Sequence, residues 1–351
     1  MSGLPKLSVL DLATVADGST PADALHNSLE LAQRVEGLGF HRYWVAEHHN
    51  MPGIASSAPA VLLAHAAGVT SSIRLGSGGV MLPNHSPLVV AEQFGMLEAL
   101  HPGRIDLGLG RAPGTDQLTA LALRRSRHRL EVDEFPEQLV ELIGYLTGSF
   151  PDRHPFSSIT AVPGLGYRPQ LWLLGSSDFS ARYAGVLGLP FSFAHHFAAA
   201  NTEPALAAYR ADFRPSDDLE APYVMLGVNV LAAEDDEQAR WLAGSGALAF
   251  LRLRTGRPGR YPTPEEASEY TFTPHEREIV KGWTASHIVG SPETVRRGLA
   301  ALVERTGADE LMVTTLTHDP GARLDSYRLV AEAAGLAPVP GETLFAAGEP
   351  G

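Results

Sequence analysis

The chain has 351 residues, of which 44% are hydrophobic, and it carries a formal net charge of −13 with a pI near 5.5. This length can bury a large core, in one elaborated α/β domain or in two smaller ones. The acidic balance and the lack of a basic run argue against nucleic-acid binding, which depends on attraction to phosphates. Because the chain has no cysteine, thiolate nucleophiles, disulfides, cysteine zinc sites and Fe–S clusters are excluded.

The N-terminal sequence MSGLPKLSVLDL lacks the basic region, apolar run and small-residue cleavage site of a signal peptide. No stretch of about 20 apolar residues occurs in the sequence. We therefore expect a cytoplasmic protein with no membrane association. Redox chemistry in such a chain needs a bound cofactor.

Eight short apolar runs bounded by turn residues predict buried strands. They span residues 7–12, 42–47, 73–82, 104–110, 171–176, 189–196, 223–233 and 310–317. Segments with a helical period follow most of them, at residues 21–39, 59–71, 87–100, 180–188 and 293–307. Nearly continuous apolar strands that alternate with helices favour an α/β fold of the (β/α)8 TIM-barrel type over an open sheet.

Two connections are too long for a single strand–helix unit, namely residues 111–170 and 234–309. We predict insertions there, near the carboxyl face of the barrel, and a lid or a partner surface is their expected use. The sequence thus predicts one domain over residues 1–335 and a flexible tail over residues 336–351.

The 14 histidines raise the question of a metal site. No two of them are two, three or four residues apart, the spacings that place two imidazoles on one face of a strand or helix. The adjacent pairs His48–His49 and His195–His196 point to opposite faces of a strand instead, so we expect no metal site. One histidine of each pair should face the barrel mouth, because both pairs end predicted strands.

Glycines interrupt the third predicted strand at Gly76, Gly78 and Gly79. Since a glycine leaves no side chain to pack, either backbone or a flat ligand ring should come close there. A bulge or a tight barrel corner would also explain them. A strained or cis peptide at Gly78–Gly79 could create the bulge that seats a ligand.

The segment LGLGRAPG at residues 107–114 is a poor dinucleotide fingerprint, because its spacing and its place in the chain are wrong. Arg111 at a strand end, followed by a basic cluster, better suits a phosphate or a polar ring edge. The cluster, which a solvated helix face would also explain, consists of Arg124, Arg125, Arg127 and Arg129.

Three serines, Ser176, Ser177 and Ser180, begin a predicted helix after the fifth strand. Hydroxyl donors, free N–H groups and the positive end of a helix together favour an anion site, and phosphates commonly bind late loops of a barrel. Plain N-capping by one serine is the alternative, and it leaves the other two unexplained.

Together, several segments resemble the bacterial luciferase-like flavin-dependent monooxygenases, and within them the single-chain luciferase-like oxidoreductase branch. These segments are LSVLDL, RYWVAEHHNMPGIASSAPAVL, GSGGVMLPNHSPLVVAEQFG, LHPGRIDLGLGRAPGTD and GSSDFSARYAG. The resemblance implies a (β/α)8 barrel that binds FMN at its carboxyl face. It also implies that the flavin ring lies over the bulge of the third strand.

The resemblance implies roles for individual residues in binding the cofactor. Ser176, Ser177 and Ser180 match phosphate-binding positions. Gly78 and Gly79 match a non-prolyl cis peptide beneath the flavin ring, and Arg111 matches a residue that contacts the ring. Among the arginines at positions 124–129, we choose Arg125 as the phosphate ligand.

Histidines carry the catalytic part of the resemblance. His48 matches the catalytic histidine of the luciferase catalytic subunit, and Glu47 or His49 would orient it. His195 falls near the flavin, at a position where that subunit has a tryptophan. This departure leaves the substrate and light emission open.

The implied activity is monooxygenation of a small organic substrate by reduced FMN and O₂ through a flavin C4a-(hydro)peroxide. A separate NAD(P)H:flavin reductase would supply FMNH₂ as a transient partner. An F420-dependent oxidoreductase of the same superfamily and a non-catalytic flavin-binding protein are the alternatives. The apolar helical segments 59–69 and 87–100, together with the resemblance, predict a homodimer.

Overall fold

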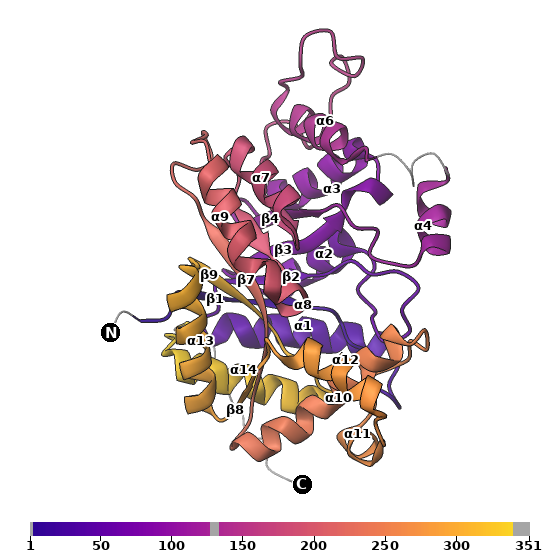
Figure 1. The fold of residues 1–351 in the computed structure, drawn as a ribbon. Helices are drawn as coiled ribbons and strands as arrows, with labels where there is room; N and C mark the ends of the chain where they lie inside the picture. The colour runs from indigo at the N-terminus through magenta and orange to yellow at the C-terminus, as the bar shows by residue number, and fades with distance from the viewer. Residues whose placement is uncertain (1–2, 127–132, 340–351) are drawn as a thin grey trace.

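The computed structural model describes residues 3–126 and 133–339 (Figure 1). Parallel strands in the order β1–β2–β3–β4–β5–β6–β7–β9 form a ring in its centre, in which β9 pairs with β1. They are β1 (Lys6–Asp11), β2 (Arg42–Val45), β3 (Arg74–Met81), β4 (Ile105–Gly110), β5 (Gln170–Gly175), β6 (Phe191–Phe193), β7 (Val224–Ala232) and β9 (Glu310–Thr314). The predicted (β/α)8 TIM barrel is confirmed, and each predicted run overlaps one of these strands. The short β8 (Ile288–Gly290), which the sequence did not predict, pairs with the end of β7.

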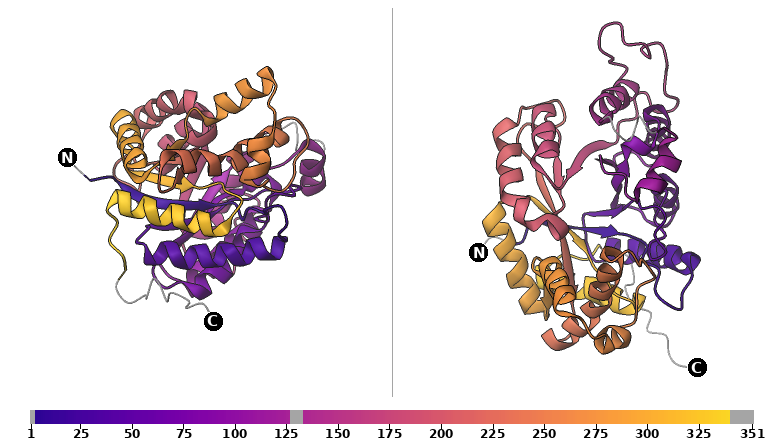
Figure 2. Two further views of the ribbon diagram at one scale, coloured as in Figure 1. Left: turned by 90° about the horizontal axis from the view of Figure 1, so that it is seen from below. Right: turned by 45° about the vertical axis from the view of Figure 1, so that its right-hand side comes forward.

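Helices surround the barrel on its outside (Figure 2). Those that complete strand–helix units are α1 (Pro21–Gly37), α2 (Pro59–Val69), α3 (Pro87–Leu100), α6 (Phe135–Thr147), α7 (Asp178–Leu187), α9 (Thr202–Asp212), α13 (Pro292–Thr306) and α14 (Pro320–Ala334). Further helical elements are η1 (Leu82–Asn84), α4 (Gln117–Arg124), α8 (His195–Ala198), η2 (Ala199–Asn201), α10 (Asp236–Arg254), α11 (Pro264–Glu269) and α12 (Pro274–Thr284). None of the helices in the described ranges is both long and apolar enough to cross a membrane.

Local sequence explains where several helices begin. Thr20 precedes α1, and its side chain accepts from the N–H of Asp23 while the Asp23 carboxylate accepts from the N–H of Thr20. Thr273 and Glu276 form the same reciprocal cap before α12. Such capping boxes satisfy N–H groups that the first helical turn leaves free.

The long connections hold both barrel helices and additional elements. Within residues 111–170, α6 packs against α3 as an ordinary outer helix, and α4 is an additional element among the described residues. Within residues 234–309, the chain at Tyr261 lies at the carboxyl end of the barrel: its N–H donates to the carbonyl of Val15 at 2.9 Å. The N–H of Val339 donates to the carbonyl of Gly37, and the remainder of the predicted tail lies outside the described residues.

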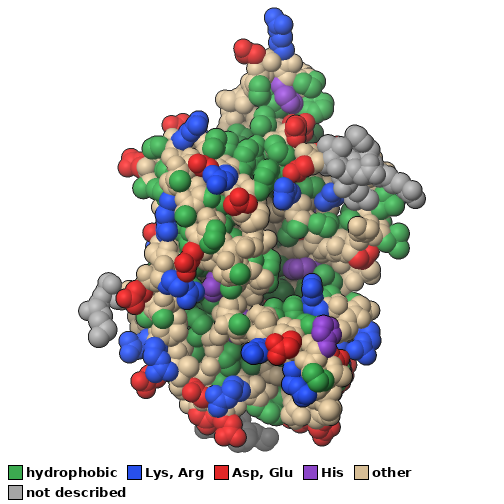
Figure 3. Space-filling view, in the orientation of Figure 1, with side chains coloured by type: hydrophobic (Ala, Val, Ile, Leu, Met, Phe, Trp, Pro, Cys, Tyr) green, Lys and Arg blue, Asp and Glu red, His purple; other side chains and the backbone are tan. Residues whose placement is uncertain are grey.

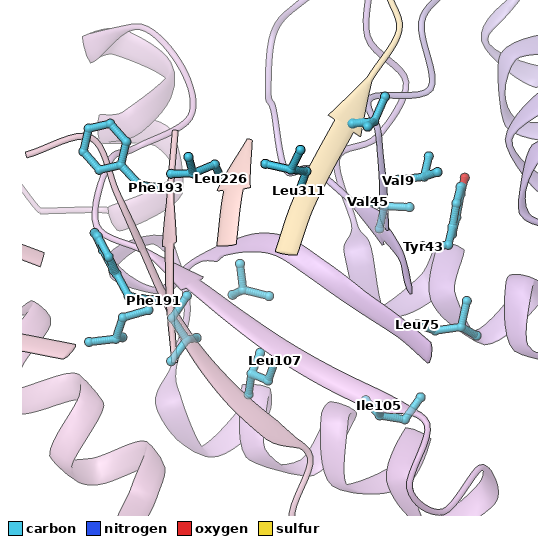
Figure 4. Packing of buried hydrophobic residues seen from close by; sticks show 14 of the residues in the cluster. Val9, Tyr43, Val45, Leu75, Ile105, Leu107, Phe191, Phe193, Leu226 and Leu311 are labelled. Carbon is cyan, nitrogen blue, oxygen red and sulfur yellow. The ribbon is translucent and has the colours of Figure 1, made fainter. Parts of the chain in front are cut away.

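The main core lies between the barrel and its helices. Side chains that alternate along the strands point outward into it, and Figure 4 shows Val9, Tyr43, Val45, Leu75 and Leu107 among them. The intervening residues point inward. A second cluster inside the barrel contains Leu10, Trp44, Ala46, Trp172, Met225 and Met312. This period of two is what a strand requires.

A network of paired charges closes the amino end of the barrel. Nη1 of Arg42 lies 2.8 Å from Asp106, and its Nε lies 3.1 Å from Glu310. The Arg42 guanidinium also stacks 4.8 Å from the ring of Trp172. Buried charges are tolerated only when paired in this way. The carboxyl end is therefore the end at which a ligand can enter.

Candidate active site

Glu47 connects the loops that follow β2 and β3 at the carboxyl end of the barrel. Its side chain is fully buried and accepts hydrogen bonds from Nε2 of His85 and Nε2 of His49, both at 2.9 Å. The backbone N–H of Met81 donates to the other carboxylate oxygen at 3.0 Å. His85 was not among the predicted site residues, although its place four residues after β3 indicates a role at this edge.

The electrostatics of Glu47 follow from these contacts. Burial acts to raise the pKa of its carboxyl, but the hydrogen bonds and charge of His85, together with the bonds from His49 and Met81, outweigh burial. The net effect is a lowered pKa. Glu47 is thus an ionised carboxylate that fixes the loops.

His48 lies beside this network but is not part of it. Its backbone N–H donates to the carbonyl of Ser56 at 2.9 Å, whereas its ring Nδ1 is buried without a hydrogen-bond partner in the described ranges. Burial lowers the pKa of His48 to about 4, so the imidazole is neutral at pH 7. Glu47 binds His49 and His85 and makes no hydrogen bond to His48 among the described residues, so the predicted orienting role of Glu47 or His49 would act through the loop that carries His48.

The glycine strand has the backbone geometry that the resemblance implied. The peptide bond between Gly78 and Gly79 is cis, and the register of β3 against β4 shifts between Gly78 and Val80. A Cβ atom on Gly78 would lie 2.7 Å from the Leu10 side chain, and one on Gly79 would lie 2.7 Å from the carbonyl oxygen of Gly108. The Leu10 side chain and the backbone of β4 therefore occupy the places that larger side chains would need, and no larger residue fits.

Arg111 and the start of α7 lie together. The Arg111 guanidinium stacks 4.3 Å from the ring of Phe179 in the first turn of α7, and its Nη1 lies 3.0 Å from Asp133. Ser177 occupies the N-cap position of α7, but its side chain makes no capping hydrogen bond. Plain N-capping, the alternative for these serines, is therefore not what the structure shows. Ser180 is buried against Gly175, while Ser176 and Ser177 are half-buried.

The arginines after α4 differ in position. Arg125 is exposed in a left-handed conformation at the end of the helix. Arg124 is half-buried, donates to Oδ1 of Asn84 at 3.1 Å and interacts electrostatically with Asp133, the partner of Arg111. The structure thus brings Arg124, rather than Arg125, toward the Arg111 group. Arg127 and Arg129 lie outside the described residues.

The second histidine pair divides between two environments. His195 is buried, and its Nδ1 lies 2.7 Å from Oγ1 of Thr202. It lines a cavity of about 680 Å³ between α9, α12 and α13, so the structure does not bring it to His48. The His196 ring lies against Gly227 of β7 and interacts electrostatically with His48. His196 is therefore the member of the pair on the barrel side.

The space-filling view agrees with a site at this end. A hollow lies in the middle of the face in Figure 3, with a histidine side chain inside it. In the part of the chain that the structure describes, no three histidine, aspartate or glutamate side chains are arranged to hold a metal ion. The described residues instead place Arg111 beside the start of α7, a cis glycine pair on β3 and a neutral histidine after β2.

Comparison with known proteins identifies the family. The profile of the luciferase-like monooxygenases matches residues 6–310, and the chain belongs to this family. Protein YvbT of Bacillus subtilis (strain 168) is 52% identical over 93% of this chain and 96% of its own. A luciferase-like monooxygenase of Escherichia coli (strain K12) is 47% identical over 93% of this chain and 96% of its own. The crystal structure of apo-MsnO8 superposes with a TM-score of 0.84 at 39% identity, covering 96% of this chain and 99% of that chain.

More distant solved structures share the fold and differ in cofactor. The oxygenating constituent of 3,6-diketocamphane monooxygenase from Pseudomonas putida, in complex with FMN, has a TM-score of 0.70 at 18% identity, covering 94% of this chain and 97% of that chain. An F420-dependent secondary alcohol dehydrogenase has a TM-score of 0.67 at 16% identity, covering 94% of this chain and 99% of that chain. At these identities the likeness concerns the fold alone.

Proposed function

We propose that the protein is an FMN-dependent monooxygenase that uses reduced flavin and O₂ to oxygenate a small organic substrate. The observation that carries this proposal is a buried histidine nitrogen without a partner, on His48, at the same barrel end as the cation and helix start formed by Arg111 and α7. Bound reduced FMN would supply the two electrons of the reaction. One oxygen atom of O₂ then enters the product and the other is reduced to water.

The residues present fit FMN. A phosphate at the start of α7 would accept hydrogen bonds from the free N–H groups of the first turn and from the hydroxyl of Ser177, which makes no capping hydrogen bond. The positive charge of Arg111 lies nearby. Ser176 and Ser180 flank this point, and Arg124 interacts electrostatically with Asp133, which also pairs with Arg111. The cis peptide and the register shift at Gly78 and Gly79 form the bulge over which a flat ring would lie.

His48 would handle the proton in this site. Since its imidazole is neutral at pH 7, it can donate one hydrogen bond and accept another without a change of charge. Glu47 and His49 would be positioning residues, because their hydrogen bond fixes the loop that carries His48. Closure by substrate and flavin would keep water from the reacting atoms.

An F420-dependent oxidoreductase is the second candidate, because a structure with that cofactor shares the fold. This alternative would transfer hydride without O₂. Oxygen uptake and flavin binding separate the two. F420 binding without FMN binding would favour the second candidate.

The phosphate placement has a direct test. We expect Ser176→Asp and Ser177→Asp to weaken FMN binding strongly, because an added carboxylate repels the phosphate dianion. Riboflavin, which lacks the phosphate, should bind wild type far more weakly than FMN does and should be less affected by the substitutions. Ser157→Asp, in an exposed loop, is the matched control. FMN affinity is measured by flavin fluorescence. Unchanged affinity in both site variants would contradict phosphate binding at the start of α7.

Partners and location complete the proposal. Exposed apolar side chains on α2 and α3, including Val61, Val89, Met96 and Leu100, support a homodimer through these helices. A separate NAD(P)H:flavin reductase would deliver FMNH₂, in the cytoplasm. Activity with chemically reduced FMN, and none with NADH or NADPH alone, would support this division of labour.

A further inference from the structure

A cavity of about 680 Å³ lies between α9, α12 and α13 (Figure 1). This volume is in the range of sites for small organic molecules, about 300–1,000 Å³. Two histidines line it, His195 of α8 and His287 just before β8, together with an ion pair between Arg305 of α13 and Glu203 of α9. Small and apolar side chains make up much of the remaining wall, among them Ala199, Ile288, Ala301 and Leu302. The proposed function gives this cavity no role.

The ring of His287 offers an N–H group to a ligand. Its Nε2 lies 2.7 Å from Nδ2 of Asn229, and the carbonyl of His196, 3.4 Å from the same Nδ2, orients this amide. Because an amide nitrogen only donates, Nε2 of His287 accepts, and the ring hydrogen is on Nδ1. Within residues 3–126 and 133–339, Nδ1 has no hydrogen bond and is not among the buried atoms left without a partner, so it is open to solvent.

The ring of His195 offers a second N–H group. Its Nδ1 lies 2.7 Å from Oγ1 of Thr202. Thr202 is 1% exposed and its hydroxyl makes no other hydrogen bond in the described part of the chain, so the hydroxyl hydrogen would be buried without a partner unless it points at Nδ1. Nδ1 therefore accepts, and the ring hydrogen is on Nε2. Nε2 is also open rather than buried and unpaired, and the space that His195 lines is the cavity.

Arg305 adds a positive charge to these two donors. Its Nε lies 3.1 Å from Oε1 of Glu203, and the two side chains are 53% and 63% exposed. An exposed ion pair of this kind contributes little stability, so a ligand can compete with Glu203 for the guanidinium. Burial and then the positive charge of Arg305 lower the pKa of His195 to about 4. The charge that acts on this ring is therefore positive.

We propose that this cavity binds a small organic carboxylate. The carboxylate accepts hydrogen bonds from Nε2 of His195 and Nδ1 of His287, and Arg305 supplies the counter-charge. The hydrocarbon part of the ligand lies against the small and apolar wall, which includes Ala301. An ammonium group cannot accept from the two N–H groups, and a neutral amide makes no use of the charge of Arg305. The inference does not depend on the proposed flavin chemistry.

Three small probes of similar size test the ligand class. Butyrate, butyramide and butylammonium are titrated into flavin-free protein with ¹⁵N-labelled histidine rings, at pH 7. We expect butyrate to shift the Nε2 signal of His195 and the Nδ1 signal of His287. Butyramide should bind about 10-fold more weakly, because it lacks the charge that Arg305 binds. Absence of the butyrate shift at either ring, or binding of butyramide or butylammonium as tight as that of butyrate, would overturn the proposal.

Arg305→Gln tests the counter-charge. We expect butyrate to bind this variant about 10-fold more weakly than wild type, the usual loss of one charge-assisted hydrogen bond, and butyramide to bind it as it binds wild type. Arg297→Gln is the matched control, because Arg297 is exposed on the same helix and does not line the cavity. Wild-type butyrate affinity in Arg305→Gln, or an equal loss in Arg297→Gln, would contradict the role of Arg305.

Ala301→Phe tests the place of binding, because a phenyl ring on this wall fills part of the cavity. We expect it to remove the binding of butyrate and of butyramide. Ala300→Phe is the matched control: both alanines are exposed on α13, but Ala300 does not line the cavity. Butyrate binding that survives in Ala301→Phe would place the ligand elsewhere and overturn the proposal.

Flavin measurements separate this inference from the proposed function. Arg305→Gln and Ala301→Phe should bind FMN with wild-type affinity, because neither residue belongs to the proposed flavin site, and FMN should not compete with butyrate. Competition between FMN and butyrate would place the carboxylate in the flavin site and overturn a separate site in the cavity. If wild type binds no FMN while it binds butyrate through Arg305, the proposed function fails and this inference stands.

Discussion

The carboxylate of Glu47 lies 2.9 Å from Nε2 of His85, and this contact joins the loops after two neighbouring strands into one unit. Because the same carboxylate also binds His49 and the N–H of Met81, its removal leaves three donors unsatisfied. The site next to His48 thus depends on a residue that does not touch His48 through a hydrogen bond.

We expect Glu47→Ala to lower the free energy of unfolding by about 1–3 kcal/mol, the usual cost of leaving a buried hydrogen-bond donor without its partner. Glu47→Gln should cost less, because its amide oxygen can still accept one hydrogen bond. Urea denaturation at pH 7 measures both. Glu30→Ala, which removes an exposed pair with Arg34 on α1, is the control and should change little. Equal stability of Glu47→Ala and wild type would contradict a structural role for the contact.

The pH dependence of stability should show two separate windows. Burial lowers the pKa of His48, His195, His196 and His287 to about 4, against about 6.5 in an unfolded chain. The unfolded state therefore binds more protons between these values, and stability should fall as pH drops from about 6.5 to about 4. The lowered pKa of Glu47 adds a further loss below about pH 4.3, its unfolded value.

Urea denaturation across this range measures both windows. His287→Gln should reduce the slope of stability against pH between about 4 and 6.5, because one titrating ring is removed. Glu47→Gln should reduce the slope only at lower pH. A flat profile between pH 4 and 6.5 would show that the histidines are not held neutral.

His48→Ala should lower turnover about 10²–10⁴-fold, the usual effect of losing a positioned acid or base. FMN binding should be nearly unchanged, because the proposed phosphate site follows β5 rather than β2. Stopped-flow absorbance with chemically reduced FMN, together with product analysis, follows this variant. His26→Ala, on the exposed face of α1, is the control. Normal product yield in His48→Ala would remove the catalytic assignment.

A homodimer through α2 and α3 predicts a particle of about twice the 37.4 kDa chain mass in light scattering. Val61 and Met96 are 62% and 52% exposed on these helices, so Val61→Glu combined with Met96→Glu should shift the mass toward the monomer. Leu118→Glu on α4 is the matched control, since Leu118 is 77% exposed and lies on another helix. A monomer in wild type at micromolar concentration would refute the dimer.

Sequence patterns predicted the barrel because buried parallel strands leave long apolar runs, whereas β8 comprises only Ile288–Gly290 and leaves no such signal. The predicted strand alternation of His195 and His196 is wrong for a physical reason. The strand β6 ends at Phe193, and both histidines lie in the short helix α8. Successive helical side chains differ by about 100° rather than 180°, so alternation does not decide which one faces inward.

Other features of the site depend on contacts between distant residues. The cis peptide at Gly78–Gly79 was expected from the resemblance and is present. By contrast, the bond between Glu47 and His85 joins residues 38 positions apart, and no local period marks it. The group formed by Arg111, Phe179 and Asp133 likewise requires the fold to bring three segments together.

The paired charges of Arg42, Asp106 and Glu310, with Trp44 and Trp172 above them, give the barrel a solid floor. A ligand that enters from the carboxyl end cannot gain affinity by extending further into the barrel, because these side chains fill its interior. Room for larger substrates must therefore come from the loops that follow the strands. Laboratory evolution toward new substrates should collect its useful substitutions in residues 111–126 and 255–287, and should find the inward-facing strand positions intolerant.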